Sequence, residues 1–221
     1  MDSWRDCKGI PFEDVLEAIN KMEYASTERV MFGMLALTGC RIMELGVMTR
    51  NKLIGNILYW RLGKNQRGTW RQEYIPSGYI EELKEYWKRA KIPPGKIFAP
   101  RGDTFSRYFN KFIRPRLNAK WRAKRPDFER KYVLGWAYKY QLKGLRKNFQ
   151  TLEFGKQLKK WKDGYIAMQF TSKRMKHHSD KITAFHYIED FEPLQIERYQ
   201  DKTMAEILKG QQSQKRILDW C

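Results

Sequence analysis

The sequence Thr38-Gly39-Cys40-Arg41-Ile42-Met43-Glu44-Leu45 stands where the hydrophobic pattern of the chain changes. Residues 28–37, just before it, are apolar nearly all round, which predicts a buried helix. Gly39 ends or bends that helix, because glycine takes the left-handed backbone conformation at little cost. Residues 41–48 then predict another short helix, with Ile42, Leu45 and Met48 facing inward. Arg41 therefore directly follows a helix break, which would direct its side chain out of the scaffold.

After this stretch the pattern changes from helical to alternating. Residues 52–62 predict two strands joined by a turn at Gly55-Asn56, and residues 70–75 predict a third strand that ends at Pro76. The sequence thus predicts an α+β fold that is mainly α-helical, with a small antiparallel sheet of three strands. Another helix is predicted after Pro11. Further helices are predicted to be capped by Ser26 or Thr27, by Ser77, and by Asp103 or Thr104, and two more are predicted over residues 133–150 and 203–218. Residues 157–169 have no defined pattern.

The charge of the chain indicates a polyanionic partner. Among the 221 residues, Lys and Arg number 44 against 25 Asp and Glu, which gives a formal net charge of +19. Aromatic residues are interleaved with the basic ones, so the positive surface belongs to a folded body rather than to a tail. Nucleic acid is the first candidate. An anionic membrane is the weaker candidate, because no basic amphipathic anchor is evident.

Cysteine use and apolar runs indicate the cellular setting. Cys7, Cys40 and Cys221 lie far apart, with no zinc-binding or CxxC spacing, which favours a reduced, cytoplasmic setting. The longest apolar run, residues 30–37, is too short to span a bilayer, and the N-terminal stretch lacks the apolar core of a signal peptide. We therefore expect no membrane association.

Five residues supply the groups that phosphodiester cleavage by a side chain needs. Such cleavage needs an attacking oxygen, cations for the non-bridging oxygens, a proton acceptor, and an acid for the leaving alkoxide. Tyr187 offers the oxygen, and Arg41 and Arg146 offer planar forks that bind two phosphate oxygens at once. Lys64, in a polar turn, can be the acid because neighbouring cations lower the pKa of a lysine. His178 can orient the phosphate or shuttle a proton.

Each of these residues also has a structural interpretation. Tyr187 could be a half-buried aromatic side chain. Arg41 could form a surface ion pair with Glu44. Arg67, close to the candidate lysine, is a rival for its role, and His177 competes directly with the neighbouring histidine. The residues alone leave these alternatives open.

The most basic part of the chain is residues 114–131. A solvated face would explain it, and so would a segment that contacts phosphates. Given the overall charge, we expect DNA contacts here. The candidate DNA-binding residues are Arg67, Arg114, Arg116, Lys120, Arg122, Lys124 and Arg125.

The motifs, in this order along the chain, resemble those of the tyrosine recombinases, the phage-type integrase family. Residues 38–45 resemble the first arginine box of the family, TGxRxxEL, and Gly63-Lys64 resembles its catalytic lysine site. The sequence Lys-Gly-Leu-Arg at 143–146 resembles its HxxR box, with lysine in place of histidine. His178 and Tyr187 match the spacing between its late histidine and its nucleophilic tyrosine.

The resemblance implies a mechanism that needs no cofactor, neither ATP nor a metal ion. Tyr187 would attack a DNA phosphate, which gives a 3′-phosphotyrosyl link and a free 5′-hydroxyl, and the 5′-hydroxyl of a second strand would reverse the reaction. The two arginines would clamp the phosphate with help from His178, and Lys64 would protonate the leaving oxygen. The implied partner is double-stranded DNA at an attachment site. The implied state is a monomer when free and a homo-oligomer, a tetramer, on DNA.

Two features depart from the usual pattern of the family. Lys143 replaces the usual histidine, which resembles integrases of archaeal viruses of the fusellovirus type and of related plasmids. Such a protein would act in the host cytoplasm or nucleoid. The interval between Arg146 and His178 is longer than bacterial relatives suggest, which predicts an insertion within residues 156–174.

The resemblance also predicts the domain organisation. Residues 1–191 would form the catalytic domain, and the family's N-terminal core-binding domain has no room before Arg41. Residues 192–221 would form a tail that contacts a neighbouring subunit or covers its own domain.

Two other functions remain possible on the sequence. A type IB topoisomerase has similar chemistry but relaxes supercoils without exchanging partners. A DNA- or RNA-binding protein without covalent chemistry would bind through the same basic surface, in a salt-dependent way.

Overall fold

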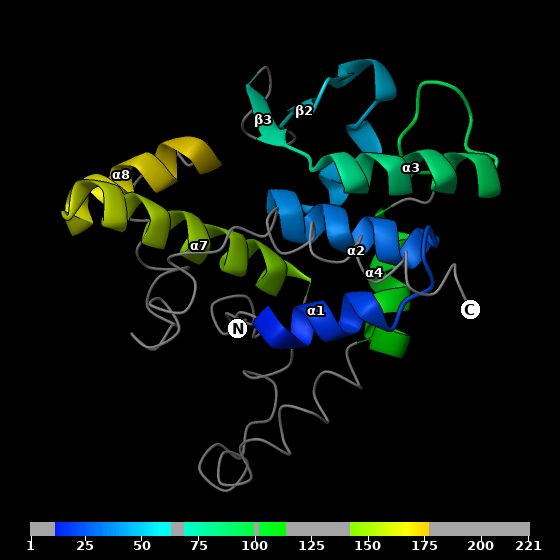
Figure 1. The fold of residues 1–221 in the computed structure, drawn as a ribbon, viewed down its shortest axis with the longest axis horizontal. Coiled ribbons are helices and arrows are strands. Elements are labelled where there is room, and N and C mark those ends of the chain that lie inside the picture. The colour runs from blue at the N-terminus through cyan, green and yellow to red at the C-terminus, as the bar shows by residue number, and fades with distance from the viewer. Residues whose placement is uncertain (1–11, 63–68, 100–101, 114–141, 177–221) are drawn as a thin grey trace, which may run out of the picture.

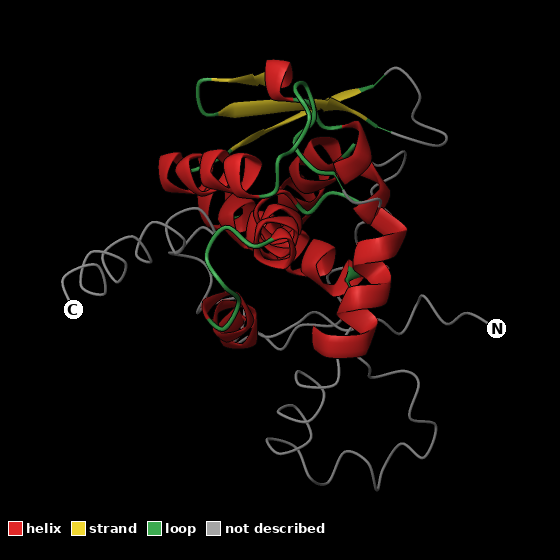
Figure 2. Ribbon diagram, turned by 90° about the vertical axis from the view of Figure 1, so that its right-hand side faces the viewer, coloured by secondary structure: helices red, strands yellow, loops and turns green. Residues whose placement is uncertain are grey.

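The computed structural model describes residues 12–62, 69–99, 102–113 and 142–176 (Figure 1). Helices make up most of these ranges, and one small sheet lies at one edge of them (Figure 2). The elements are α1 (Phe12–Asn20), α2 (Thr27–Thr38), the 3₁₀ helices η1 (Ile42–Val47) and η2 (Arg50–Lys52), β1 (Leu53–Ile54), β2 (Ile57–Arg61), β3 (Trp70–Tyr74), α3 (Ser77–Arg89), α4 (Gly102–Tyr108), the π-helix η4 (Phe109–Ile113), α7 (Lys143–Trp161) and α8 (Gly164–Met175).

Helix α2 is the centre of the core. Its residues 30–38 are all buried, and it contacts α1, α3 and α7. The Ser26 hydroxyl caps the helix by accepting a hydrogen bond from the Arg29 backbone N–H at 3.3 Å. Gly39 ends it in the left-handed conformation, with a φ of 56°. Both ends lie where the sequence predicts them, because a capping hydroxyl and a helix-ending glycine are local signals.

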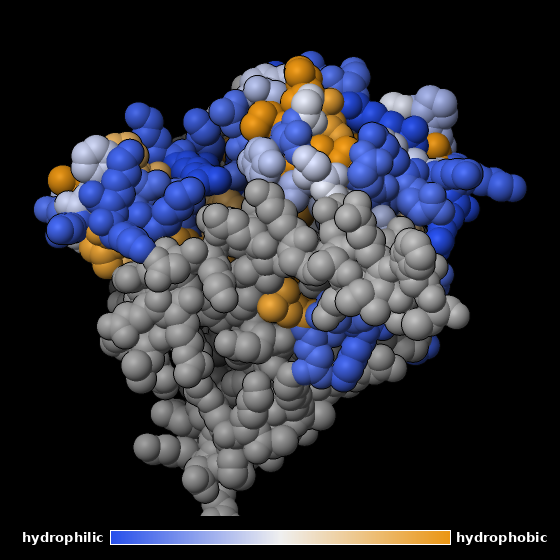
Figure 3. Space-filling view, viewed as in Figure 1, coloured by the Kyte–Doolittle hydropathy of each residue, from blue (hydrophilic) through white to orange (hydrophobic). Residues whose placement is uncertain are grey.

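The sheet is antiparallel, in the order β1-β2-β3. Its register places Trp60 of β2 opposite Arg71 of β3, and alternate residues of both strands are buried. The outer face carries the exposed Ile54 and Tyr74. Figure 3 shows apolar residues gathered where the sheet lies, among hydrophilic residues that cover most of the described surface. The mainly α-helical fold with a three-stranded antiparallel sheet is thus confirmed.

Two predicted caps are wrong. Pro76 occupies the N-cap position of α3, so Ser77 is its first helical residue, and its hydroxyl accepts a hydrogen bond from Asn56 Nδ2 at 3.0 Å instead. Helix α4 begins at Gly102, so Asp103 and Thr104 lie in its first turn rather than before it.

Residues 157–169, which have no defined pattern in the sequence, form the end of α7 and the first half of α8. Lys162 ends α7 in the left-handed conformation, and Asp163 caps α8 by accepting from the Ile166 backbone N–H at 2.9 Å. The rings of Trp161 and Phe170 stack at 5.1 Å between centroids, and both are partly exposed. Exposed aromatic residues disguise the helical period here. The segment predicted as an insertion is therefore a helical hairpin.

Within the described ranges, no helix combines the length and apolar character needed to cross a membrane. The predicted helix over 133–150 is described only from residue 142 onward, and the one over 203–218 lies outside the described residues.

Candidate active site

Arg41 is placed by the break after α2. It precedes η1 with an extended backbone, and Glu44 binds it twice. Glu44 Oε2 accepts from the Arg41 backbone N–H at 3.2 Å, and Oε1 accepts from Arg41 Nη1 at 3.0 Å. The Arg41 side chain is 42% exposed, and no other hydrogen bond joins its guanidinium to the rest of the described chain. The ion pair that the sequence left open is therefore present, and it orients the guanidinium without burying it.

Glu44 is itself fixed from a second side. Trp60 of the sheet donates its indole Nε1–H to Glu44 Oε2 at 3.1 Å, and the carboxylate is buried. A buried carboxylate that accepts three hydrogen bonds has a defined position. The direction of Arg41 is thus tied to the sheet through Glu44 and Trp60.

Arg146 reaches the same turn from the other side. It lies on the first turns of α7, is 5% exposed, and donates from Nη1 to the Gly39 carbonyl oxygen at 2.6 Å. Gly39 ends α2, so its carbonyl belongs to the electronegative end of that helix. The two arginine boxes, far apart in sequence, therefore meet at the turn Gly39–Arg41.

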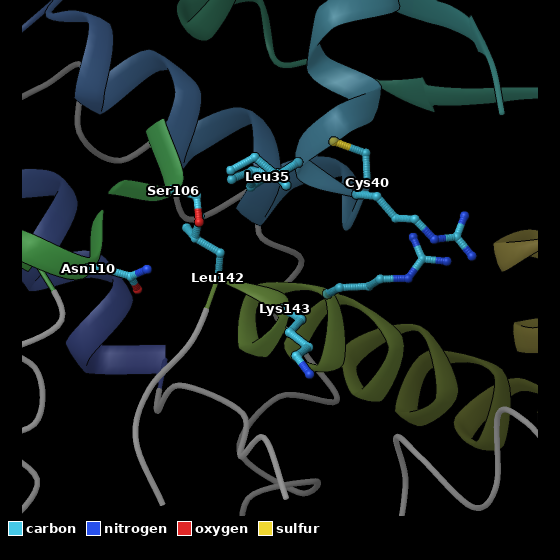
Figure 4. Close-up of a pocket in the computed structure, with 9 residues that line it drawn as sticks. Leu35, Cys40, Ser106, Asn110, Leu142 and Lys143 are labelled. Carbon is cyan, nitrogen blue, oxygen red and sulfur yellow. The ribbon is translucent and has the colours of Figure 1, made fainter. Parts of the chain in front are cut away.

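The two arginines line one cavity of 430 Å³ (Figure 4). Its charged lining residues are Arg41, Lys143 and Arg146, so the described lining holds three cations and no carboxylate. Such a site suits an anion, and the planar forks of arginine suit the paired oxygens of a phosphate. The remaining lining residues are Leu35, Cys40, Ile42, Ser106, Asn110 and Leu142.

Cys40 carries the thiol at this cavity. Burial and, to a smaller extent, the nearby carboxylate of Glu44 raise its pKa to about 12, against smaller lowering effects from Thr38, Arg71 and Arg146. The thiol is therefore neutral at physiological pH. Because the thiolate is the nucleophilic form, Cys40 does not supply the attacking group.

Ser106 of α4 and Asn110 of η4 also line the cavity, opposite the turn that carries Cys40 (Figure 4). They lie four residues apart, where the α-helix passes into a π-helix, and π-helices often occur at functional sites. The sequence analysis did not select them, because no motif marks them. Only their spacing on one face of a predicted helix could have done so.

The structure brings together three of the predicted catalytic residues. Arg41, Arg146 and the exposed Lys143, the first residue of α7, share the cavity. The other predicted catalytic residues lie outside the described residues: Lys64, His178 and Tyr187, with the rival His177. The same is true of the predicted DNA-binding residues, which are Arg67, Arg114, Arg116, Lys120, Arg122, Lys124 and Arg125.

No metal centre is evident in the ranges that the structure describes, since no three His, Cys, Asp or Glu side chains gather there as ligands. The chemistry of the cavity is that of arginine and lysine: binding and neutralising an anion.

Comparison with known proteins gives a match in structure but none in sequence. No family model and no curated protein matches the sequence. The fold is similar to the crystal structure of XerA recombinase, with a TM-score of 0.55 and 18% sequence identity. The match covers 84% of this chain and 60% of that one, so this chain spans less than two thirds of the length of XerA recombinase. At this identity the likeness concerns the fold alone: the fold of this chain is similar to that of XerA recombinase.

Proposed function

We propose that this chain is a site-specific DNA recombinase of the tyrosine type, which cleaves and rejoins DNA strands through a 3′-phosphotyrosyl intermediate. One observation supports the proposal more strongly than the others. Arg41 and Arg146 meet at one cavity, with Lys143 beside them, in a fold shared with XerA recombinase.

The arginines act on the phosphate in this proposal. As the attacking oxygen approaches phosphorus, negative charge builds on the two non-bridging oxygens. Arg41 and Arg146 neutralise that charge, and because they are already held by Glu44 and by the Gly39 carbonyl, they need little rearrangement. Lys143 adds a third positive charge where the usual family pattern has histidine.

The covalent steps conserve the number of phosphodiester bonds. The Tyr187 hydroxyl loses its proton, with His178 as the proposed acceptor, and its oxygen bonds to phosphorus while the bond to the 5′ oxygen breaks. Lys64 gives the leaving 5′ oxygen a proton. The 5′-hydroxyl of another strand then attacks the phosphotyrosine and releases Tyr187. Since the energy of the phosphodiester stays in the phosphotyrosine, the cycle needs no ATP.

The partner in this proposal is double-stranded DNA at an attachment site. The net charge of +19 supports DNA binding, and residues 114–131 supply many of the cations. Residues 1–191 form the catalytic domain and 192–221 the tail. The protein is a monomer when free and a tetramer on DNA. Lys143 favours an integrase like those of archaeal viruses and plasmids, acting in the host cytoplasm or nucleoid.

Covalent trapping tests the reaction. The full chain is incubated with nicked suicide substrates of varied sequence, which lose the 5′-hydroxyl fragment needed for reversal, and is then denatured. We expect a shifted band with the wild-type protein and none with Tyr187→Phe. Tyr165→Phe is the matched control, because Tyr165 is 66% exposed on α8 and does not line the cavity. It should form the adduct at the wild-type rate.

Other outcomes would contradict the proposal. Tight DNA binding without an adduct across all substrates would indicate a binding protein. An adduct that survives Tyr187→Phe would assign the nucleophile to another tyrosine, with Tyr165 and Tyr199 next to test. Relaxation of plasmids without exchange of partners would indicate a topoisomerase instead.

A further inference from the structure

A network of charged side chains, three of them buried and one partly exposed, connects to the turn between the two arginines of the cavity. It begins at Arg71 on β3, whose side chain is 1% exposed, and passes through Glu73, which is 2% exposed. Arg71 donates to Glu73 Oε1 from Nη2 at 2.9 Å and from Nε at 3.3 Å. Arg174 of α8 donates from Nη2 to Glu73 Oε2 at 2.6 Å and from Nη1 to Glu153 of α7. These four side chains join the sheet to the α7–α8 hairpin.

The first member of this network also touches the arginine box. Arg71 Nη2 donates to the carbonyl oxygen of Thr38, the residue before Gly39. Arg146 binds the Gly39 carbonyl, so two arginines from different elements hold two successive carbonyls at the end of α2. The backbone of the turn that leads to Arg41 is therefore fixed by Arg71 as well as by Arg146.

Two aromatic rings lie against Arg71. Its guanidinium lies 5.2 Å from the ring centroid of Trp60 and 5.2 Å from that of Phe149. Trp60 also binds Glu44, and Phe149 lies one turn after Arg146 on α7. Arg71 thus packs against Trp60, which binds the Glu44 partner of Arg41, and against Phe149 on the helix that carries Arg146.

Stability alone does not explain this arrangement. Burying charges is costly, and buried ion pairs are often no more stable than apolar side chains of the same size. Arg71 Nη1 is buried and makes no hydrogen bond within the described chain, which adds to the cost. What the network provides is a fixed orientation of the turn that leads to Arg41.

We propose that Arg71 is a positioning residue of the phosphate site, which holds the turn Thr38–Gly39 so that Arg41 points into the cavity at the angle Arg146 requires. The inference rests on the proposed function for its effect on cleavage. Its effect on the turn does not depend on that function. Displacing a catalytic group by about 1 Å can slow a reaction on the order of 100-fold, so we expect Arg71→Met to slow cleavage by about 10- to 100-fold.

The test compares Arg71→Met with Arg50→Met in the full chain. Arg50 has the same kind of contacts, to the carbonyls of Lys96 at 2.8 Å and Ile92 at 3.0 Å and to the Trp87 ring at 4.2 Å, but it does not line the cavity. Single-turnover adduct formation at saturating suicide DNA should slow in Arg71→Met, with the Kd for DNA unchanged. Arg50→Met should retain the wild-type rate under conditions where circular dichroism shows it folded. Equal rates in the two variants would overturn the inference.

A double variant tests whether Arg71 acts through Arg41. If it does, Arg41→Ala/Arg71→Met should cleave at the rate of Arg41→Ala alone. If the two losses multiply, Arg71 acts elsewhere and the inference is wrong. Arg71→Lys covers the case in which Arg71→Met does not fold. It keeps the charge but cannot bind the carboxylate and the carbonyl with one planar fork, so cleavage at the wild-type rate would also overturn the inference.

Cys40 gives a readout that needs no DNA. In a Cys7→Ser/Cys221→Ser background, the buried Cys40 thiol should react slowly with a disulfide reagent such as DTNB. Arg71→Met should speed this reaction at least tenfold by loosening the turn, and Arg50→Met should not. No change in Arg71→Met would overturn the inference. A faster reaction together with no DNA adduct in the wild-type protein would refute the proposed function while the role of Arg71 in the turn stands.

Discussion

Gly39→Ala should destabilise the protein far more than an ordinary glycine substitution. Gly39 has a φ of 56°, in the left-handed region, and an added Cβ would lie 2.7 Å from both Cβ and Cγ of Phe149. Phe149 is a core residue of α7 next to the cavity arginine on that helix, and it is 8% exposed. The substitution therefore strains the backbone and also pushes apart the two segments that build the phosphate site.

Two terms set the size of the effect. The left-handed conformation costs an alanine about 1–2 kcal/mol. Forcing an extra methyl group into a packed interior costs about 1–3 kcal/mol more. Together they predict that the free energy of unfolding falls by about 2–5 kcal/mol, a large part of the roughly 5–15 kcal/mol that holds a typical domain together.

Gly55→Ala is the matched control. Gly55 has almost the same φ, 58°, but nothing lies within 4 Å of its added Cβ. It should lose only the conformational term, about 1–2 kcal/mol. Urea unfolding followed by circular dichroism measures both variants, and the difference between them isolates the contact of Gly39 with Phe149.

A difference between the two variants below about 0.5 kcal/mol, the usual limit of additivity, would refute the close approach of Gly39 and Phe149. A double variant adds a second check. Phe149→Ala removes Cγ and the rest of the ring, which supply two of the three nearest contacts of the new methyl group, and keeps Cβ, so Gly39→Ala should cost less in that background than in the wild-type protein. An equal cost in both backgrounds would show that the clash is not with the ring of Phe149.

Two further predictions concern the same turn. Glu44→Gln removes the charge that holds Arg41 but keeps an acceptor for Trp60. We therefore expect the free energy of unfolding, measured in urea, to fall by about 1–2 kcal/mol, and adduct formation to slow. Wild-type values for both would contradict the role of this carboxylate. For Cys40, the folded protein keeps the thiol proton up to a pKa of about 12, whereas the unfolded chain loses it near the usual 9.0. Stability is therefore unaffected below pH 9 and falls above it by about 1.4 kcal/mol per pH unit. Cys40→Ala should lack this fall in urea unfolding between pH 8 and 10.5, and the same pH dependence in both proteins would refute the burial of the thiol.

Local signals in the sequence predicted much of the fold. The cap at Ser26 and the helix end at Gly39 follow from single residues, and the alternating pattern on either side of Gly55-Asn56 predicted the sheet. Helix α8 was missed because its exposed aromatic residues, Tyr165 and Phe170, lie where a helical pattern predicts polar ones. Periodicity reports which face is buried, so it fails where apolar residues face solvent.

The site was predicted in part, for a different reason. Arg41 and Arg146 were found because their motifs are contiguous in sequence. Arg71 and Glu73 were missed because a charged pair on a strand usually faces solvent, and their burial depends on α7 and α8 packing against the sheet. The roles of Lys64, His178 and Tyr187 stay predictions, which the trapping experiment tests.

The hydrogen bond between Arg146 and Gly39 joins residues 107 positions apart. A contact of this separation closes a long loop, and it forms only after the intervening chain exists. During synthesis at about 5–20 residues per second, Arg41 precedes Arg146 by on the order of 5–20 s. In the proposed mechanism, a nascent chain during that interval carries half of the phosphate clamp. It can touch DNA through its early cations, but it cannot cut until α7, and after it Tyr187, have been made.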